Sequence, residues 1–172
     1  MKSVLLLRGI NVGGHGKLPM AELRALLEGL GAEDVATYIQ SGNVVMRGAP
    51  RSDEIADAIE EQFGFRPTCM LIGAEAFAEG LANDPFKEAR ETPKLLHYFF
   101  CADEPHPNRQ KLDALLSGAE RYEIIGKVMY FHAPDGMGRS KFGARAESHL
   151  GVSATARNLN TVAKLREMLD AI

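Results

Sequence analysis

The spacing of apolar residues changes from strand-like to helix-like near the start of the chain. Residues 2–8 are rich in valine and leucine, as expected of a buried strand. From Pro19 onward, apolar residues recur every three or four positions, which places them on one stripe of a helix. These residues are Met20, Leu23, Leu26, Leu27 and Leu30. Because proline suits the first turn of a helix and glycine the position just past its end, we predict a helix from Pro19 that ends before Gly31.

A hairpin, a second helix and another strand follow. Residues 35–46 contain two β-rich runs around the small polar segment Ser41-Gly42-Asn43, and this arrangement is typical of a hairpin. Ser52 is placed to cap the next helix, which Gly64 ends. Residues 65–72 read as a strand. The order β-α-β-β-α-β is that of a ferredoxin-like unit.

The same order recurs after a connector at residues 73–93, which contains a short helix at 74–82 and a polar, proline-bounded loop. The second series of predicted elements is a strand at 94–102, a helix at 107–117, a hairpin at 122–132, a helix at 140–151, a strand at 152–156 and a closing helix at 158–172. Letters recur as well as elements, since Tyr-x-x-x-Gly at residues 38–42 returns at residues 122–126. The matching order and letters indicate an internal duplication.

These patterns predict an α+β protein made of two ferredoxin-like βαββα(β) repeats, with antiparallel sheets that carry helices on one face. The first unit covers residues 1–72, and a separate connector covers residues 73–93. The second unit covers residues 94–172 and includes the closing helix, which has no counterpart in the first.

Composition and charge narrow the class of protein. The chain of 172 residues is 45% hydrophobic and 25% charged, which is typical of a globular protein in water. Its net charge of −3 disfavours general nucleic-acid binding. The first apolar run breaks at Arg8, too early for a secretion signal or a membrane span. Cys69 and Cys101 lie in apolar runs, as buried reduced thiols do. We therefore expect a cytoplasmic protein without a membrane partner.

The segment RGINVGGHGK, residues 8–17, lies where a phosphate-binding loop would lie, between a strand and a helix. The P-loop pattern G-x-x-x-x-G-K-[ST] fails here, because His15 follows Gly14 and no hydroxyl residue follows Lys17. We expect first a turn whose glycines permit positive φ. The second interpretation is a weak anion site in which Arg8, Asn11 and Lys17 supply the donors.

Three motifs in combination, "LLRGINVGG…K", "TYIQSGNVV" and "TARNLNTVAKL", resemble a bacterial family of uncharacterised proteins, domain of unknown function 1697. The resemblance extends from Leu5 to Leu169 and implies a double ferredoxin-like fold without an accepted activity. Family members often have tryptophan where this chain has Leu159, and phenylalanine where it has Met46. Both departures weaken the idea of aromatic stacking on a ligand.

Polar residues in two of these motifs add candidate ligand contacts. Asn158 could cap the closing helix, with Arg157 beside it and with Thr161 and Lys164 on the adjoining helix surface. In the QSGN motif, glycine and asparagine suit a hairpin turn, whereas Gln40 and Ser41 have no evident role in the turn. These four polar helix residues and the two turn residues could reach a ligand if the fold brings them together.

Several kinds of chemistry lack their motifs. The five histidines show no H-E-x-x-H or paired Cys/His spacing, so we predict no metal and no cofactor. No G-x-S-x-G elbow is present, and no catalytic residue can be named. The segment GKVMYFHA, residues 126–133, matches the aromatic signature of RNA-recognition domains poorly, which disfavours nucleic acid.

The function predicted from the sequence is binding of a small anion or a phosphorylated ligand at a polar cleft. An enzyme acting on a small phosphorylated or carboxylated metabolite is the first alternative, and a single-stranded nucleic-acid module is the second. The predicted ligand-binding residues are Arg8, Asn11, Lys17, Gln40, Ser41, Asn43, Arg157, Asn158, Thr161 and Lys164.

Overall fold

The computed structural model describes residues 1–48 and 50–172. The chain forms two compact units, one of residues 1–79 with 164–172 and one of residues 80–163. The sequence assigned the whole closing helix to the second unit. In the structure this helix, α6 (Leu159–Ala171), contributes its residues from Lys164 onward to the first unit. Its Leu169 is buried, and the carbonyl of that residue accepts a hydrogen bond of 3.1 Å from Lys2 Nζ.

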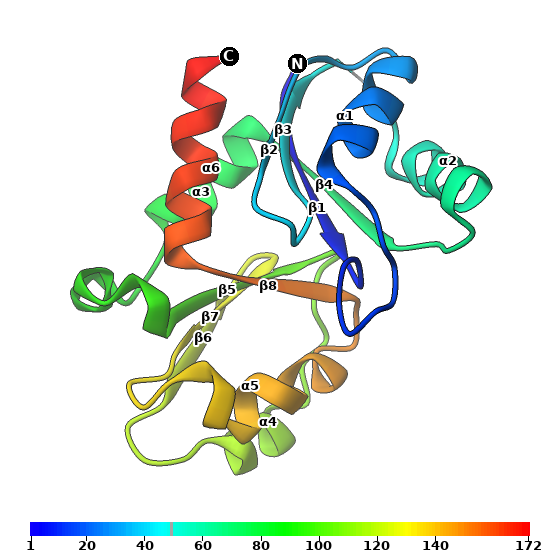
Figure 1. The fold of residues 1–172 in the computed structure, drawn as a ribbon. Helices are drawn as coiled ribbons and strands as arrows, with labels where there is room; N and C mark the ends of the chain where they lie inside the picture. The colour runs from blue at the N-terminus through cyan, green and yellow to red at the C-terminus, as the bar shows by residue number, and fades with distance from the viewer. Residues whose placement is uncertain (49) are drawn as a thin grey trace. The chain divides into compact units, whose positions relative to one another are not determined.

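The first unit is a four-stranded antiparallel sheet with two helices (Figure 1). Its strands stand in the order β2-β3-β1-β4. The elements are β1 (Lys2–Arg8), α1 (Met20–Gly29), β2 (Glu33–Tyr38), β3 (Asn43–Arg47), α2 (Ser52–Phe63) and β4 (Thr68–Gly73). This is the β-α-β-β-α-β order that the hydrophobic pattern predicts.

The core of the first unit lies between the sheet and helices α1 and α2. Leu5 and Leu7 of β1 belong to one buried cluster with Leu23 of α1 and Ile59 of α2. Burial of such a side chain contributes about 1.5–3 kcal/mol. The alternate β1 residue Leu6 is also fully buried, so β1 is apolar on both faces. This explains why residues 2–8 show no strict alternation of apolar and polar positions.

The second unit repeats the arrangement, with the strand order β6-β7-β5-β8. Its elements are β5 (Leu96–Cys101), α4 (Arg109–Leu115), β6 (Arg121–Ile125), β7 (Val128–His132), α5 (Lys141–Arg145) and β8 (Ala154–Asn158). Helices α4 and α5 lie on one side of this sheet (Figure 1). Phe131 of β7 stacks on Phe142 of α5, with ring centroids 4.3 Å apart. The two units are thus similar in strand order and in the placement of their helices.

The remaining segments are short. Helix α3 (Ala74–Ala82) follows β4 over the residues predicted to be helical. The proline-bounded segment after it forms two 3₁₀ turns, Lys87–Glu91 and Pro93–Leu95. Two further 3₁₀ turns, Met137–Arg139 and Ala146–His149, flank α5. Within the part of the chain that the structure describes, no helix is long and apolar enough to cross a membrane.

The start of α2 corrects one prediction. Ser52 is the first helical residue, and Arg51 occupies the N-cap position. The Glu54 carboxylate accepts a hydrogen bond of 2.9 Å from the backbone N–H of Arg51. An acidic residue three positions into a helix supports the first turn in this way without a hydroxyl cap. The expected cap at Ser52 is therefore wrong by one position.

The end of β8 differs from the prediction as well. The strand extends through Arg157 and Asn158, whereas the sequence suggested that it stops at residue 156. Tyr98 of β5 pairs with Arg157, and His97 pairs with Asn158. Backbone pairing with a neighbouring strand thus extends β8 to the residue that precedes α6.

Candidate functional site

The glycine-rich segment between β1 and α1 is a tight backbone turn. Val12 and His15 exchange two backbone hydrogen bonds of 3.1 and 2.9 Å. Between them, Gly13 and Gly14 have φ of 56° and 79°. Positive φ at both central positions is the signature of a type I′ turn, which glycine adopts without strain. The loop is therefore a small hairpin, as the failed P-loop spacing suggested, and it differs from a nucleotide-binding loop.

Two glycines near this turn leave no room for a side chain. A Cβ atom at Gly16 would clash with the carbonyl oxygen of Gly9. A Cβ atom at Gly42 would lie 2.7 Å from Leu7 Cβ and 2.8 Å from Ile10 Cδ1. The Gly42 carbonyl also accepts a hydrogen bond of 2.8 Å from Leu7 N. Close packing of backbone thus accounts for these glycines, so they are not evidence of a ligand.

Asn11 joins the glycine turn to the β2–β3 loop. Its Nδ2 atom donates to the carbonyl oxygens of Leu18 at 2.9 Å and Gln40 at 2.8 Å. Its Oδ1 atom accepts from Leu18 N at 2.8 Å. The amide group is therefore occupied by the backbone of both loops, and Asn11 has a structural role. We call residues 8–18 and 39–43, which it holds together, the loop end of the first unit.

Asn43, the first residue of β3, has a similar structural role where the β2–β3 loop ends. It is fully buried, and its Nδ2 atom donates to Tyr38 O at 3.0 Å and to Ser41 Oγ at 2.9 Å. Gln40 and Ser41 are exposed beside it. The second half of the QSGN motif thus closes the turn, whereas its first half lies in solvent.

Ile39 opens the same loop in an unfavourable conformation. Its φ is 51°, and its side chain is 52% exposed. A β-branched residue rarely adopts positive φ, and such strain costs about 1–3 kcal/mol. Asparagine or glycine would adopt this conformation more readily. Neither burial nor backbone geometry explains an isoleucine here.

The loop end has a basic character. Arg8 and Lys17 are exposed, as is His15. Residues 8–18 and 39–43 contain no aspartate or glutamate, so the two segments carry a formal charge of +2 from one arginine and one lysine. The structure therefore brings six of the ten predicted residues to one end of one unit, and four of them, Arg8, Lys17, Gln40 and Ser41, are exposed.

Three predicted residues lie in the second unit. Arg157 Nη1 donates to Thr155 Oγ1 at 2.7 Å and to Ala156 O at 2.9 Å. Burial lowers the pKa of Arg157 to about 10, so the side chain stays protonated at neutral pH. Asn158 Oδ1 accepts from Thr161 N at 3.0 Å, which makes Asn158 the cap of α6. Thr161 is buried rather than on the helix surface.

The tenth predicted residue, Lys164, belongs to the first unit. Its Nζ atom lies 3.4 Å from Glu167 Oε1 in an exposed ion pair. Such pairs contribute little to stability. Convergence of all the predicted residues on one ligand stays a prediction.

Sequence reasoning missed a buried polar network in the second unit. The side chain of Asp84 is fully buried, and its carboxylate accepts hydrogen bonds from Tyr98 OH at 2.7 Å and Phe86 N at 2.8 Å. Arg90 Nε lies 3.4 Å from the same carboxylate. Burial and the neighbouring Asp84 carboxylate raise the pKa of Tyr98. Because its partners satisfy the buried charge, the network is a structural element.

A sequence signal for this network exists but is weak. Asp84 lies in a polar segment that reads as a solvated loop, and only the adjacent aromatic Phe86 suggests burial. The aromatic run in β5 is a stronger sequence signal for a buried segment, and Tyr98, Phe99 and Phe100 are indeed all buried. A stacking platform for nucleic-acid bases requires exposed rings. The three buried rings of this run therefore cannot form such a platform.

The two cysteines and the possible metal ligands among the described residues were compared with the requirements of thiol and metal chemistry. Burial raises the pKa of the Cys69 thiol to about 12 and that of Cys101 to about 11, so both are poor nucleophiles at neutral pH. Among residues 1–48 and 50–172, no group of three histidine, cysteine, aspartate or glutamate side chains is arranged to hold a metal ion.

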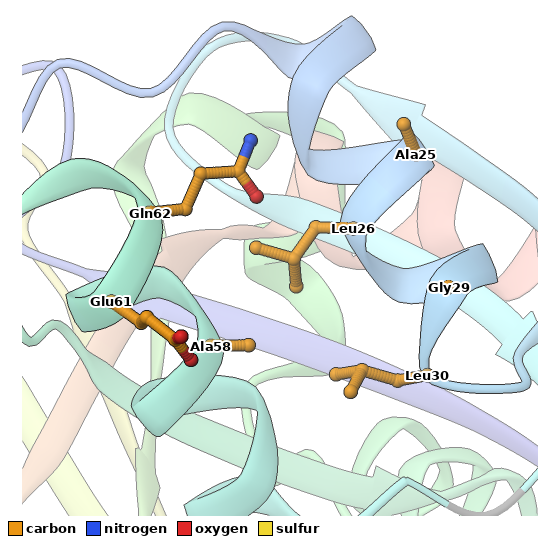
Figure 2. Close-up of a pocket in the computed structure, with 7 residues that line it drawn as sticks. All are labelled: Ala25, Leu26, Gly29, Leu30, Ala58, Glu61 and Gln62. Atoms are coloured by element: carbon orange, nitrogen blue, oxygen red, sulfur yellow. The ribbon is translucent and has the colours of Figure 1, made fainter.

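A shallow groove lies between α1 and α2 of the first unit, as Figure 2 shows. Its volume is about 560 Å³. It is lined by Ala25, Leu26, Gly29, Leu30, Ala58, Glu61 and Gln62. None of these is a predicted site residue, and the groove is largely apolar.

Comparisons with known proteins identify a similar structure and a matching family. A solved structure of a conserved bacterial protein from Streptococcus pneumoniae is similar, with a TM-score of 0.72, 25% sequence identity and coverage of 98% of both chains. No curated protein matches the sequence. The model of the family described as "Protein of unknown function (DUF1697)" matches residues 1–130. The chain therefore belongs to the DUF1697 family of proteins of unknown function.

Proposed function

We propose that the loop end of the first unit binds a small anion, such as the phosphate or carboxylate group of a metabolite. The observation that carries the proposal is the Asn11 bridge, which holds the loop of Lys17 against the loop of Gln40. The two loop segments contain basic residues and no acidic ones. Their positive charge attracts an anion, and no carboxylate on the same segments opposes this attraction.

Binding rather than catalysis is the better-supported role of the loop end. The side chains of Asn11 and Asn43 are engaged with the backbone and cannot act on a substrate without breaking the turn. His15 is the only histidine of the two segments. His15 is exposed on a turn, and neither loop segment supplies an acidic residue that could orient it as a catalytic base. An enzyme acting on a phosphorylated metabolite stays the alternative.

The setting of the site is part of the same proposal. The strand order of each unit, with two helices on one side, is that of a ferredoxin-like domain. Both cysteines, the half-buried Cys69 and the buried Cys101, are free thiols, which favours a reducing compartment, and we infer a cytoplasmic protein.

Titration with inorganic phosphate, followed by backbone amide NMR, tests the proposal. We expect millimolar affinity and shifts confined to residues near Gly13 and Gln40, with weaker binding at higher salt. Lys17→Ala should reduce affinity several-fold. Lys127→Ala is the matched control, because Lys127 is an exposed lysine beside the hairpin glycine of the second unit. The same spectra report on Arg157, Asn158 and Thr161, and shifts there would extend the site to them.

Absence of shifts at millimolar phosphate would contradict the proposal. Equal losses from Lys17→Ala and Lys127→Ala would also contradict it, because general attraction to positive charge would then explain the binding.

A further inference from the structure

Two exposed aliphatic residues flank the Asn11 bridge. Val12 is 64% exposed and Ile39 is 52% exposed, more than the other large apolar side chains of the described residues except Met1. Val12 follows Asn11, and Ile39 precedes Gln40, so the hydrogen bond of 2.8 Å between Asn11 and Gln40 places them on adjoining loops. An exposed aliphatic residue is common by itself. Here two of them lie on adjoining loops, one of which also carries the exposed Lys17.

The backbone around these residues does not require them. Ile39 has a φ of 51°, which a β-branched residue adopts only under strain. The turn at Val12 depends on Gly13 and Gly14, and position 12 accepts any residue that can pair with His15. Backbone strain of the kind seen at Ile39 is concentrated at ligand-binding sites in proteins. The apolar character of both positions therefore points to something outside the chain.

We propose that Val12 and Ile39 contact the apolar body of a ligand whose anionic group is held near Lys17. The ligand class is then a phosphate or carboxylate attached to an aromatic or aliphatic group, rather than inorganic phosphate. This inference rests on the anion site proposed above. The surface suits a small ligand, because a stable protein interface buries about 800 Å² on each partner and two aliphatic side chains supply only part of that. The turns are fixed by hydrogen bonds, so little ordering is needed when a ligand binds.

Binding of three probes tests the inference: inorganic phosphate, methyl phosphate and phenyl phosphate. We expect phenyl phosphate to bind at least five-fold tighter than methyl phosphate to the unchanged protein. Ile39→Asn should remove most of this preference and leave the affinity for inorganic phosphate unchanged. It should also raise the melting temperature, because asparagine tolerates positive φ. A gain in stability with a loss of preference separates a ligand contact from a structural role.

Two further variants complete the experiment. Val12→Thr keeps the β-branched shape and should also reduce the preference for phenyl phosphate. Leu30→Gln is the control, since Leu30 is 36% exposed on a different part of the first unit. It should leave the preference unchanged. Sedimentation of each variant shows whether Val12 and Ile39 instead join copies of the chain.

The outcomes are distinguishable. If no probe binds, both the anion site and this inference fail. If all three probes bind equally, the anion site stands and the inference is overturned. A preference for phenyl phosphate that survives both Ile39→Asn and Val12→Thr overturns it too, as does a change in self-association without a change in preference.

Discussion

The two units share a strand order but differ in the loop that follows their first strand. In the first unit, residues 9–19 are glycine-rich, contain Lys17 and have no acidic residue. In the second unit, residues 102–108 read ADEPHPN, with Asp103, Glu104 and two prolines. The equivalent loops therefore have opposite charge. A common scaffold thus carries a basic loop in one unit and an acidic loop in the other.

The hairpins of the two units differ despite the same Tyr-x-x-x-Gly letters. In the first unit, β2 ends at Tyr38, which pairs with Asn43 across a four-residue loop. In the second unit, β6 continues to Ile125, which pairs with Val128 across a two-residue turn. The open loop of the first unit exposes Gln40 and Ser41, and the tight turn of the second has no such residues. The proposed anion site therefore has no counterpart in the hairpin of the second unit.

The sheet faces that lie opposite the helices of each unit also differ, and this difference predicts the largest effect. The first sheet has aliphatic residues such as Leu6 where the second has Tyr98 bonded to the buried Asp84. Asp84→Ala should lower the free energy of unfolding by about 3–5 kcal/mol, because it leaves Tyr98 and Arg90 without their partner. Urea denaturation measures this loss. Asp103→Ala, an exposed control in the same unit, should change stability by less than about 0.5 kcal/mol.

The helix cores should respond alike in both units. Leu26→Ala in α1 should cost about 2–5 kcal/mol, with the lower half expected because Leu26 is 9% exposed and lines the groove of Figure 2. Leu112→Ala in α4, where the leucine is fully buried, should cost at least as much. Chemical denaturation of both variants provides the comparison. A loss under about 0.5 kcal/mol at Leu26 would contradict the helix phase derived from the sequence.

The hairpin glycines should respond differently. Gly42 has a φ of 85° and close neighbours, whereas Gly126 has a φ of 58° and nothing within 4 Å of a Cβ atom. Gly42→Ala should therefore cost about 2–4 kcal/mol, from strain and overpacking together. Gly126→Ala should cost only about 1 kcal/mol, from backbone strain. Thermal unfolding of the two variants would show equal losses if close packing at Gly42 were unimportant.

The smallest effect concerns acid stability and a half-buried histidine of the second unit. His97 Nδ1 has no hydrogen-bond partner within the described part of the chain, and burial lowers the pKa of His97 to about 4. The unfolded chain, with a histidine pKa near 6.5, then binds more protons between pH 6.5 and 4. Stability should fall as the pH drops through this window, by about 2 kcal/mol at pH 5.

A His97→Gln variant isolates this contribution. Its free energy of unfolding should depend less on pH between 6.5 and 4 than that of the unchanged protein, as measured by denaturation at several pH values. In the first unit, the buried polar residue with an unpartnered atom is Ser3, which does not titrate in this range. Ser3→Ala should leave the pH dependence unchanged. An identical slope in all three proteins would remove His97 as its source.

The sequence alone determined the order and type of the elements. Leucines at helical spacing from Met20 onward, the left-handed glycine at residue 64 and the aliphatic run at residues 2–8 depend only on local geometry and on the period of burial. For the same reason, the sequence is sufficient to reject a P-loop at residues 8–17 and to predict Asn158 as a helix cap. The hydrogen bond from Thr161 N to Asn158 Oδ1 confirms the cap. Such local rules fail where two neighbouring residues can both occupy the N-cap position of a helix, as Ser52 and Arg51 can at the start of α2.

Only the tertiary structure decided what the polar residues do. Asn11 and Asn43 look alike in sequence to ligand-binding residues, but their amides bond backbone groups of segments up to 29 positions away. Asp84 looks like a loop residue, but it lies buried against a tyrosine from β5. A side chain's partners depend on which loops and strands the folded sheet brings together. That juxtaposition is a property of long-range packing, and the spacing of residues along the chain does not contain it.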